Sequence, residues 1–472
     1  MPSFKESADY LPELAEFVAI PSVSRESNPP DMRAAAQWLA GQLTFANARV
    51  VETEGNPVVA GEWLGAPGAP TVLVYGHYDV QPTGSLSEWR TPPFELTVAD
   101  GVDGSRAYGR GATDDKGPIL VVLKTAQAYM EQRGGLPLNV KFLFEGEEEI
   151  GSPNLPAFLR ANAEQFAADL VISADGAQWR PTEPSVSIAS KGLAALDITV
   201  TGAGRDLHSG RYGGTVQNPV HTLAQVLAGL HDANGRVAVP GFYDGVAGLT
   251  AQQRAEIAAI AFDDAEYADE LGVPSLYGEP GYSTLERLWM RPTLEVNGIT
   301  GGGPYTVIPH TASAHVTCRL VPGQEPAAVI EAIRAHVNSA ATPGVRVEVV
   351  AEKGGASAYT IDPGHPAVAA ARDALAAVYP GEDVILARIG GTLPGTVLFE
   401  EVLDAKTLFF SFSISDEMLH APNEFLRVRR LGEGMRAWSL LWEQLSGQRP
   451  GAMSASAWAT ATGSAAARAS AE

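Results

Sequence analysis

Short apolar runs alternate with helical segments between residues 70 and 175, and this alternation constrains the fold more than any other feature of the chain. The pattern predicts strands at 71–76, 138–146 and 169–175 and helices at 118–132 and 154–166. The first strand, "TVLVYG", is rich in β-branched residues, and Pro118 stands in the first turn of the first helix. Repeated strand–helix–strand units form a largely parallel sheet that helices cover on both faces. The residues therefore predict an α/β domain.

The pattern changes near residue 186 and returns near residue 357. The expected elements between these points are strand, helix, strand, strand, helix and strand, at 185–202, 218–230, 291–299, 311–323, 325–337 and 345–354. This order predicts a small α+β sandwich inserted into the first domain. The α/β pattern then resumes with a helix at 365–379, a strand at 407–415 and an amphipathic helix at about 423–445.

We therefore expect one domain built from residues 1–185 and 357–445, with a second domain, residues 186–356, inserted into it. The remaining segment, 446–472, is rich in Ala, Ser and Gly and has no periodic apolar pattern. Such a segment cannot bury enough apolar surface to offset the entropy of ordering it, so we expect it to be disordered.

Composition limits the partners and the compartment. Lys and Arg number 33 against 55 Asp and Glu, a net charge of −22, which disfavours nucleic acid and anionic membranes as partners. Cys318 is the only cysteine, so no internal disulfide forms and a reducing compartment fits. The chain has neither a signal-like start nor an uninterrupted run of 18 apolar residues. These observations predict a cytoplasmic protein.

Acidic and imidazole side chains follow four predicted strands, where an open α/β sheet binds its ligands, and a further Asp pair lies just before the helix at 118–132. They are His77, Asp79, Asp114, Asp115, Glu147, Glu148, Glu149, Asp175 and His420. Each group alone has an ordinary explanation: a solvated face for the three Glu, a helix N-cap for the Asp pair, a turn for Asp175 and a structural role for His420. Together, these groups would repel one another at one sheet edge unless cations neutralised them. The set therefore suggests two Zn²⁺ or Mn²⁺ ions about 3.5–4 Å apart that share one carboxylate.

Five segments of the chain, in order, resemble the signature segments of the M20 family of metallopeptidases, particularly its carnosinase-like dipeptidase branch. They are "YGHYDVQP", "GRGATDDKGP", "FEGEEEIGS", "DLHSG" and "GGTLP", and the similarity runs from about residue 10 to 445. The resemblance implies that His77, Asp114 and Asp175 hold one metal ion. It implies that Asp114, Glu149 and His420 hold the other, so that Asp114 bridges the two. It also implies a catalytic di-metal domain with an inserted lid or dimerisation domain.

The resemblance further assigns the general base to Glu148, and it makes Asp79 the carboxylate that orients His77. His77 and Asp79 are spaced i and i+2, which in an extended backbone places both side chains on the same side. The triple Glu leaves one alternative, because a slip of one residue would make Glu147 the base. The family also implies a cis peptide bond between residues 114 and 115.

The inserted domain carries the residues expected at the substrate. Period-2 alternation in "HTASAHVTCRL" predicts that Cys318 faces the core and that Arg319 points away from it. Arg319 is either an ordinary surface charge or, by resemblance, a bidentate clamp for the terminal carboxylate of the substrate. Thr306 and Thr392 fall where the dipeptidase branch has further substrate contacts. His208 would stabilise the oxyanion in the site of a partner subunit, which implies a homodimer.

These inferences predict a cytoplasmic, homodimeric hydrolase that cleaves the peptide bond of dipeptides or short peptides. Two divalent metal ions, zinc or alternatively manganese, would activate a water molecule. An N-acyl- or N-carbamoyl-amino-acid amidohydrolase with the same metal site is the nearest alternative. A catalytically silent binding protein is a third possibility, but Glu148 and His208 are needed for turnover rather than for holding metal, and both are present.

Overall fold

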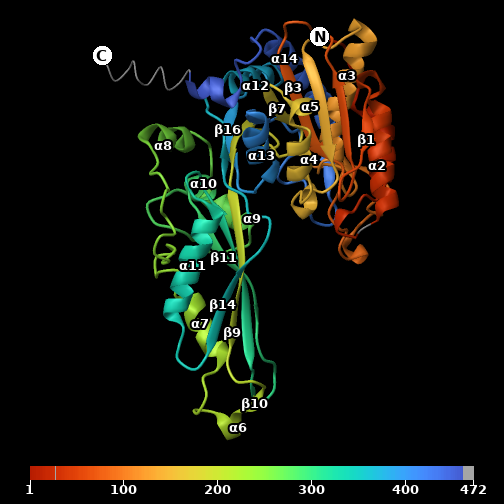
Figure 1. The fold of residues 1–472 in the computed structure, drawn as a ribbon. Coiled ribbons are helices and arrows are strands. Elements are labelled where there is room, and N and C mark those ends of the chain that lie inside the picture. Colours follow the sequence, from red (N-terminus) through yellow and green to blue (C-terminus); the bar gives the residue numbers. More distant parts are fainter. Residues whose placement is uncertain (27, 461–472) are drawn as a thin grey trace, which may run out of the picture. The chain divides into compact units, whose positions relative to one another are not determined.

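The computed structural model describes residues 1–26 and 28–460. They divide into two compact units, which Figure 1 draws as ribbons. Unit 1 comprises residues 1–188, 361–388 and 395 onward, and unit 2 comprises residues 189–360 and 389–394. Within the described ranges, the helices are too short or too polar to span a lipid bilayer.

A mixed sheet forms the centre of unit 1. Its strands are β1 (Arg49–Val51), β2 (Val58–Trp63), β3 (Thr71–His77), β6 (Asn139–Glu145), β7 (Leu170–Ser173), β8 (Ser185–Ser190) and β17 (Thr407–Phe409). Their order is β1-β2-β6-β3-β7-β17-β8, and β15 (Tyr359–Thr360) and β16 (Ile385–Ile389) also pair with β8. The four central strands, β6, β3, β7 and β17, run parallel to one another. The predicted α/β class with a mostly parallel sheet is confirmed.

Helices cover both faces of this sheet. The helices of unit 1 are α1 (Leu11–Val18), α2 (Pro29–Gln42), α3 (Lys116–Arg133), α4 (Leu155–Ala161), α5 (Ala163–Phe166), α12 (Pro366–Val378), α13 (Pro394–Leu403) and α14 (Arg429–Ser446). Helices α4, α5 and α13 pack against Leu73 and Leu143 on one face. On the other face, α3 brings Ile119 against Gly76 so closely that a Cβ at position 76 would lie 2.9 Å from it. Glycine at 76 thus lets α3 approach the carboxyl end of β3.

A small antiparallel sheet in unit 1 corrects one predicted boundary. It contains β4 (Thr97–Gly101), β5 (Gly104–Tyr108) and β18 (Phe425–Arg427), in the order β18-β5-β4. The last helix, predicted from about 423, begins only at Arg429 because residues 425–427 pair with β5. The strand predicted at 407–415 is likewise short, since β17 ends at Phe409.

The segment that follows α14 differs from its predicted disorder. Met453 is fully buried, and the backbone N–H of Ser456 donates to the Asp404 carboxylate at 3.0 Å. The rings of Trp458 and His365 lie 5.2 Å apart, edge to face. A few specific contacts therefore hold residues 447–460 against unit 1, although their composition has no periodic pattern. The rest of the predicted tail, 461–472, lies outside the described residues.

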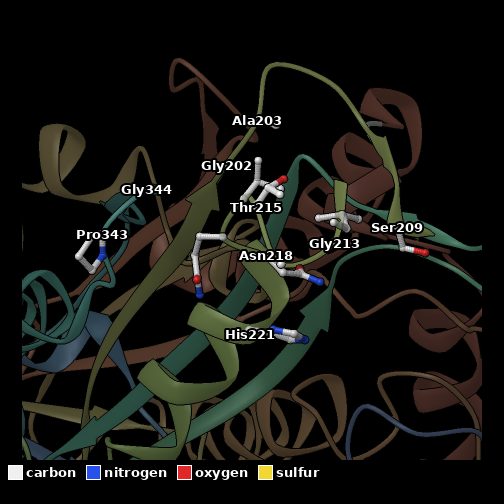
Figure 2. Close-up of a pocket in the computed structure, with 13 residues that line it drawn as sticks. Gly202, Ala203, Ser209, Gly213, Thr215, Asn218, His221, Pro343 and Gly344 are labelled. Carbon is white, nitrogen blue, oxygen red and sulfur yellow. The ribbon is translucent and has the colours of Figure 1, made fainter. Parts of the chain in front are cut away.

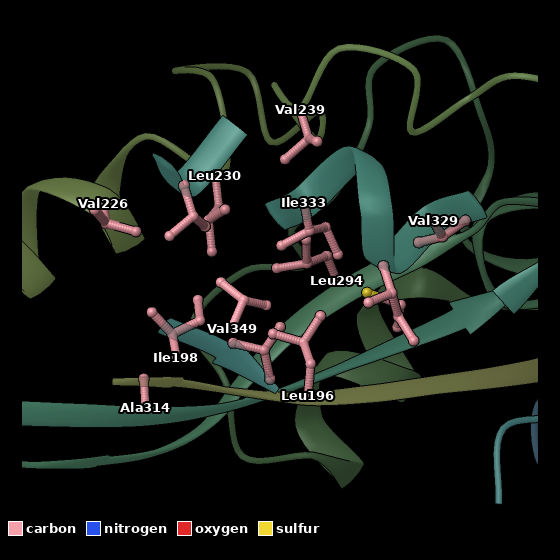
Figure 3. Packing of buried hydrophobic residues seen from close by; sticks show 14 of the residues in the cluster. Leu196, Ile198, Val226, Leu230, Val239, Leu294, Ala314, Val329, Ile333 and Val349 are labelled. Carbon is pink, nitrogen blue, oxygen red and sulfur yellow. The ribbon is translucent and has the colours of Figure 1, made fainter. Parts of the chain in front are cut away.

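Unit 2 is an antiparallel sheet covered on one face by two helices. Its strands, in the order β11-β13-β9-β14, are β11 (Thr293–Thr300), β13 (Thr311–Leu320), β9 (Gly192–Thr201) and β14 (Arg346–Ala351). The covering helices are α7 (Pro219–Ala228) and α11 (Pro326–Ala340), and Figure 3 shows their apolar side chains packed over the sheet. Smaller elements are β10 (Leu207–His208), α6 (Ser209–Tyr212), α8 (Ala251–Ala258), α9 (Asp264–Glu270), α10 (Thr284–Met290) and β12 (Val307–Ile308).

The alternation predicted for the third strand of this unit is confirmed. Burial in β13 alternates residue by residue, with Cys318 fully buried among Leu196 and Ile333 and its neighbour Arg319 only half-buried. The single cysteine is therefore a core thiol, and burial raises its pKa to about 12. A thiol in this environment is unreactive.

Candidate metal centre

Loops at one edge of the unit 1 sheet carry the predicted metal ligands. His77 is the last residue of β3, Asp175 follows β7, and Glu149 lies in the 3-10 helix Glu148–Ile150 just after β6. Asp114 lies in the loop before α3, and His420 lies in the loop before β18. The parallel strands bring their carboxyl ends to the same edge, which is why residues distant in sequence meet here.

The five side chains form two groups that share Asp114. In the first group, His77 Nε2 lies 3.2 Å from Asp114 Oδ1 and 3.9 Å from Asp175 Oδ2. In the second group, His420 Nε2 lies 2.9 Å from Asp114 Oδ2 and 3.3 Å from Glu149 Oε2. Within each group, the potential ligand atoms all lie within 4.8 Å of one another. Asp114 thus presents one carboxylate oxygen to each group, as a bridging ligand must.

The electrostatics of these groups fit two divalent cations. Burial raises the pKa of Glu149 to about 8 and that of Asp175 to about 6, and the Asp114 carboxylate adds to both shifts. Burial acts on Asp114 in the same direction, but hydrogen bonds with His420 and His77 lower its pKa below the usual range. Several acidic groups are therefore held together out of water, an arrangement that is unfavourable for their ionised forms. Positive charge at the centre would relieve this, and imidazole with carboxylate is a donor set that suits zinc and manganese.

The two remaining glutamates of the acidic triplet have different surroundings. The Glu147 carboxylate accepts hydrogen bonds from the backbone N–H of Asn56 at 3.0 Å and from Asn154 Nδ2 at 3.0 Å. The Glu148 carboxylate is partly exposed, and within the described residues it accepts no hydrogen bond. Burial raises its pKa well above the ordinary value, and the carboxylates of the metal-ligand groups add to this. Glu148 therefore has a carboxylate that is available to a substrate or water, whereas Glu147 does not.

Asp79 contacts both sides of the centre. His77 Nδ1 lies 3.0 Å from the backbone carbonyl oxygen of Asp79 and 3.5 Å from Oδ1 of the Asp79 carboxylate. The same carboxylate accepts the backbone N–H groups of Glu148 and Glu149 at 3.2 and 3.1 Å. Asp79 therefore holds the imidazole of one metal group and also the turn that carries Glu148 and Glu149.

The peptide bond between Asp114 and Asp115 is cis, so that prediction is confirmed.

Sequence reasoning missed several residues that hold the ligands in place. Gln81 Nε2 donates to Glu149 Oε2 at 2.7 Å, and Arg25 donates to the Glu149 carbonyl oxygen at 3.2 Å. Glu417 and Glu424 are fully buried, and both accept hydrogen bonds from Thr113 in the loop that carries Asp114. Gln81 lies inside the segment "YGHYDVQP", and Glu417 and Glu424 lie within four residues of His420, but nothing in the sequence indicates which way these side chains point.

The predicted substrate residues fall into two pairs, both in unit 2, whereas every predicted metal ligand is in unit 1. Arg319 Nη1 donates to Thr392 Oγ1 at 2.9 Å. His208 lies opposite Val307 in the β10–β12 pair, and the backbone N–H of Ser209 donates to the Thr306 carbonyl oxygen at 2.9 Å. His208 and Thr306 are both exposed.

A pocket of about 900 Å³ lies beside the β10–β12 pair in unit 2 (Figure 2). Its lining residues are Gly202, Ala203, Ser209, Gly213, Gly214, Thr215, Val216, Gln217, Asn218, His221, Ile308, Pro343 and Gly344. Asn218 caps α7 by accepting the Val220 N–H at 2.9 Å. None of the lining residues is a predicted metal ligand or substrate contact, although Ser209 directly follows His208.

Comparison with known proteins identifies the family. The model of "Peptidase family M20/M25/M40" matches residues 73–444. The chain belongs to this family. The M20 chain is 31% identical over 468 residues to the Cys-Gly metallodipeptidase dug1 of Schizosaccharomyces pombe, which covers 94% of this chain and 97% of that protein. It is 29% identical to the Beta-Ala-His dipeptidase of Homo sapiens, over 93% of this chain and 90% of that one.

Solved structures agree with the family and the fold. The M20 chain superposes on the di-peptidase Dug1p from Saccharomyces cerevisiae with a TM-score of 0.79 at 28% identity, covering 93% of this chain and 96% of that one. Human carnosine dipeptidase 1 gives the same TM-score and identity, covering 94% and 97%. The resemblance stated from the five sequence segments is therefore confirmed, and the chain is an M20 peptidase.

Proposed function

We propose that this M20 peptidase is a two-metal dipeptidase. One observation carries the proposal: Asp114 offers its two carboxylate oxygens to two separate groups of potential ligands. Relatives at about 30% identity over most of the chain are dipeptidases of Cys-Gly and Beta-Ala-His, which supports a dipeptide as the substrate class. Zinc is the metal we propose, with manganese as the alternative, because both accept imidazole and carboxylate ligands.

The chain's own residues account for the proton transfers. When bound, two divalent ions bring the pKa of a water molecule down towards about 7 and stabilise negative charge on the scissile carbonyl oxygen. Glu148 then accepts a proton from the attacking water and later donates it to the amine nitrogen as the C–N bond breaks. The absence of a hydrogen bond to the Glu148 carboxylate from the described residues supports this role. Asp79 keeps Glu148 in place through the backbone of the turn.

Arg319 is proposed to bind the terminal carboxylate of the substrate. It is half-buried, its pKa is lowered by burial, and within the described residues it has no carboxylate partner. A half-buried cation without a counter-ion has an unsatisfied preference for an anion. The bond from Arg319 to the Thr392 hydroxyl fixes one edge of the guanidinium, and the other N–H groups are available to a bidentate partner.

His208 is proposed to act on the substrate bound by a partner subunit, which makes the active enzyme a homodimer, and Thr306 is proposed as a further substrate contact. His208, on β10, and Thr306, just before β12, are both exposed, which supports contact with another molecule. His208 would donate a hydrogen bond to the oxygen that becomes negative in the transition state. A cytoplasmic location is also proposed, supported by the single, buried, unpaired cysteine.

A substrate panel tests the proposal. Purified enzyme is depleted of metal, reloaded with Zn²⁺ or Mn²⁺, and assayed with a dipeptide library beside N-acetyl- and N-carbamoyl-amino acids. Metal-dependent cleavage of dipeptides in preference to the acylated amino acids is expected. A preference for the acylated amino acids would indicate the amidohydrolase alternative, and no cleavage in any metal form would contradict the proposed activity.

A further inference from the structure

A buried glutamate on the His420 loop binds the loop that carries Asp114. The Glu424 side chain is fully buried, and its Oε2 accepts from Arg110 Nη1 at 2.7 Å and from the Gly111 N–H at 2.9 Å. Its Oε1 accepts the backbone N–H groups of Thr113 and Asp114 at 3.0 and 3.1 Å. One carboxylate therefore satisfies four donors of a loop that has no regular secondary structure.

A second buried glutamate, Glu417, holds the same loop from the other side of His420. Its Oε2 accepts a hydrogen bond from the Thr113 hydroxyl. Its Oε1 accepts hydrogen bonds from the backbone N–H of Arg427 at 3.0 Å and from the Arg427 guanidinium at 3.1 Å. The backbone N–H of Ile414 also donates to it at 3.0 Å. Thr113 thus contacts both glutamates, through its N–H and its hydroxyl, and it directly precedes Asp114.

The backbone around His420 needs such support. His420, Met418 and Asn423 have φ angles of 60°, 58° and 65°, in the left-handed region that residues with a Cβ rarely adopt. Conformations of this kind persist where surrounding contacts enforce them. The two glutamates stand three residues before and four residues after His420, so their contacts fix both ends of the segment that presents its imidazole.

We propose that Glu417 and Glu424 are positioning residues that set the distance between Asp114 and His420, and thereby the affinity of the metal group formed by Asp114, Glu149 and His420. The inference rests on the proposed two-metal function. It makes a specific claim about one of the two ions. Weakening the hydrogen bonds that Glu417 and Glu424 accept releases first the ion held by Asp114, Glu149 and His420. A purely structural role for the glutamates would lower stability without such selectivity.

Thr113 allows a test that keeps both glutamates intact. Thr113→Val is nearly isosteric and removes only the hydroxyl bond to Glu417, whose other donors remain. Thr113→Ser retains the hydroxyl. Tyr129→Phe is the matched control, because the Tyr129 hydroxyl is buried in unit 1 and bonds Ser439 and Glu443 on α14, away from the metal ligands. Each variant is loaded with Zn²⁺, and the metal retained per chain is followed by elemental analysis during dialysis against a chelator.

The expected result is that Thr113→Val loses one of two ions about 10- to 100-fold faster than wild type, the range by which metal affinity falls when hydrogen-bond partners around the ligands are removed. Thr113→Ser should restore retention, and Tyr129→Phe should lower the melting temperature while keeping both ions. Adding His420→Ala to Thr113→Val should cause no further loss, whereas adding Asp175→Ala should release the second ion.

Two outcomes would overturn the inference. One is that Thr113→Val releases both ions no faster than wild type does. The other is that the control, Tyr129→Phe, loses both ions as fast as Thr113→Val loses its ion. A wild-type protein that binds fewer than two ions would instead contradict the proposed two-metal function, so the two failures are distinguishable. Glu424→Gln serves as a second variant and should release the same ion, because an amide cannot accept all four donors.

Discussion

Asp114 and His420 lie 306 positions apart in the sequence, yet His420 Nε2 is 2.9 Å from Asp114 Oδ2. The other oxygen of the same carboxylate faces His77 at 3.2 Å. This contact links the two groups of potential metal ligands through a single side chain.

The first prediction separates the base from its neighbouring ligand. Glu148→Gln should reduce kcat by about 100- to 10,000-fold while both metal ions stay bound, because an amide cannot accept the proton of the water. Glu149→Gln should lower metal occupancy, since Glu149 lies 3.3 Å from His420 within the second group. Metal content by elemental analysis and turnover of a dipeptide are measured on both variants. Loss of metal from Glu148→Gln would mean that the register of the glutamates is wrong.

The second prediction concerns the proposed carboxylate clamp. Arg319→Ala should weaken kcat/KM by the equivalent of roughly 1.5–3 kcal/mol, the usual range for a hydrogen bond to a charged group. Amidating the C-terminus of the dipeptide should harm wild type by a similar factor. The same amidation should change little in the variant, because the interaction is already gone. Equal sensitivity of both enzymes to amidation would exclude Arg319 as the clamp.

The third prediction tests whether His208 works across a dimer. His208→Ala should depress kcat by about 100- to 1,000-fold, as expected on removing one oxyanion donor. Mixing Glu148→Gln subunits with His208→Ala subunits should restore activity, because one site of each hybrid dimer is then intact. Hybrids are verified by differently tagged subunits. If verified hybrids stay as inactive as the parent variants, His208 acts only within its own chain.

The fourth prediction is a pH dependence in unit 2, away from the metal ligands. Burial, together with the charges of Arg319 and Arg291, lowers the pKa of Lys191 to about 8, although its Nζ donates to the Arg291 carbonyl oxygen at 2.6 Å. Between about pH 8 and pH 10.4, the unfolded chain binds a proton that the folded chain has released. Stability should therefore rise with pH across this window, by roughly 3 kcal/mol at most.

Lys191→Met provides the comparison for that prediction. Melting temperatures of wild type and variant are measured at about pH 7.5 and about pH 9.5, and wild type should gain stability relative to the variant as the pH rises. Other groups that titrate in this range affect both proteins alike. Parallel pH dependence in the two proteins would show that the Lys191 ammonium is not destabilised by its burial.

Much of the fold could be predicted from the sequence because its signals are local. The β-branched run at 71–76 and the period-2 alternation around Cys318 each reflect burial of a single strand, and both strands are present. The metal ligands could be proposed because they stand at strand ends and match family segments. Asp114 and His420 are candidates on the sequence alone, but the bridging role of Asp114 and the ligand role of His420 follow only from the resemblance.

The remaining features depend on contacts between distant parts of the chain. Glu424 binds Gly111 and Thr113 more than 300 residues away, and the sequence around it gives no sign of those donors. The segment 447–460 packs through isolated side chains such as Met453, which compositional reasoning treats as part of a low-complexity tail. The late start of α14 has the same origin, since residues 425–427 pair with β5.

The most direct test of the two-metal claim is anomalous diffraction from crystals of the zinc-loaded enzyme at the zinc absorption edge. Two peaks about 3.5–4 Å apart are expected, with one oxygen of Asp114 directed at each. His77 and Asp175 should flank one peak, and Glu149 and His420 the other. A single peak in a fully loaded crystal, or two peaks of which one does not contact Asp114, would contradict a two-metal site bridged by Asp114.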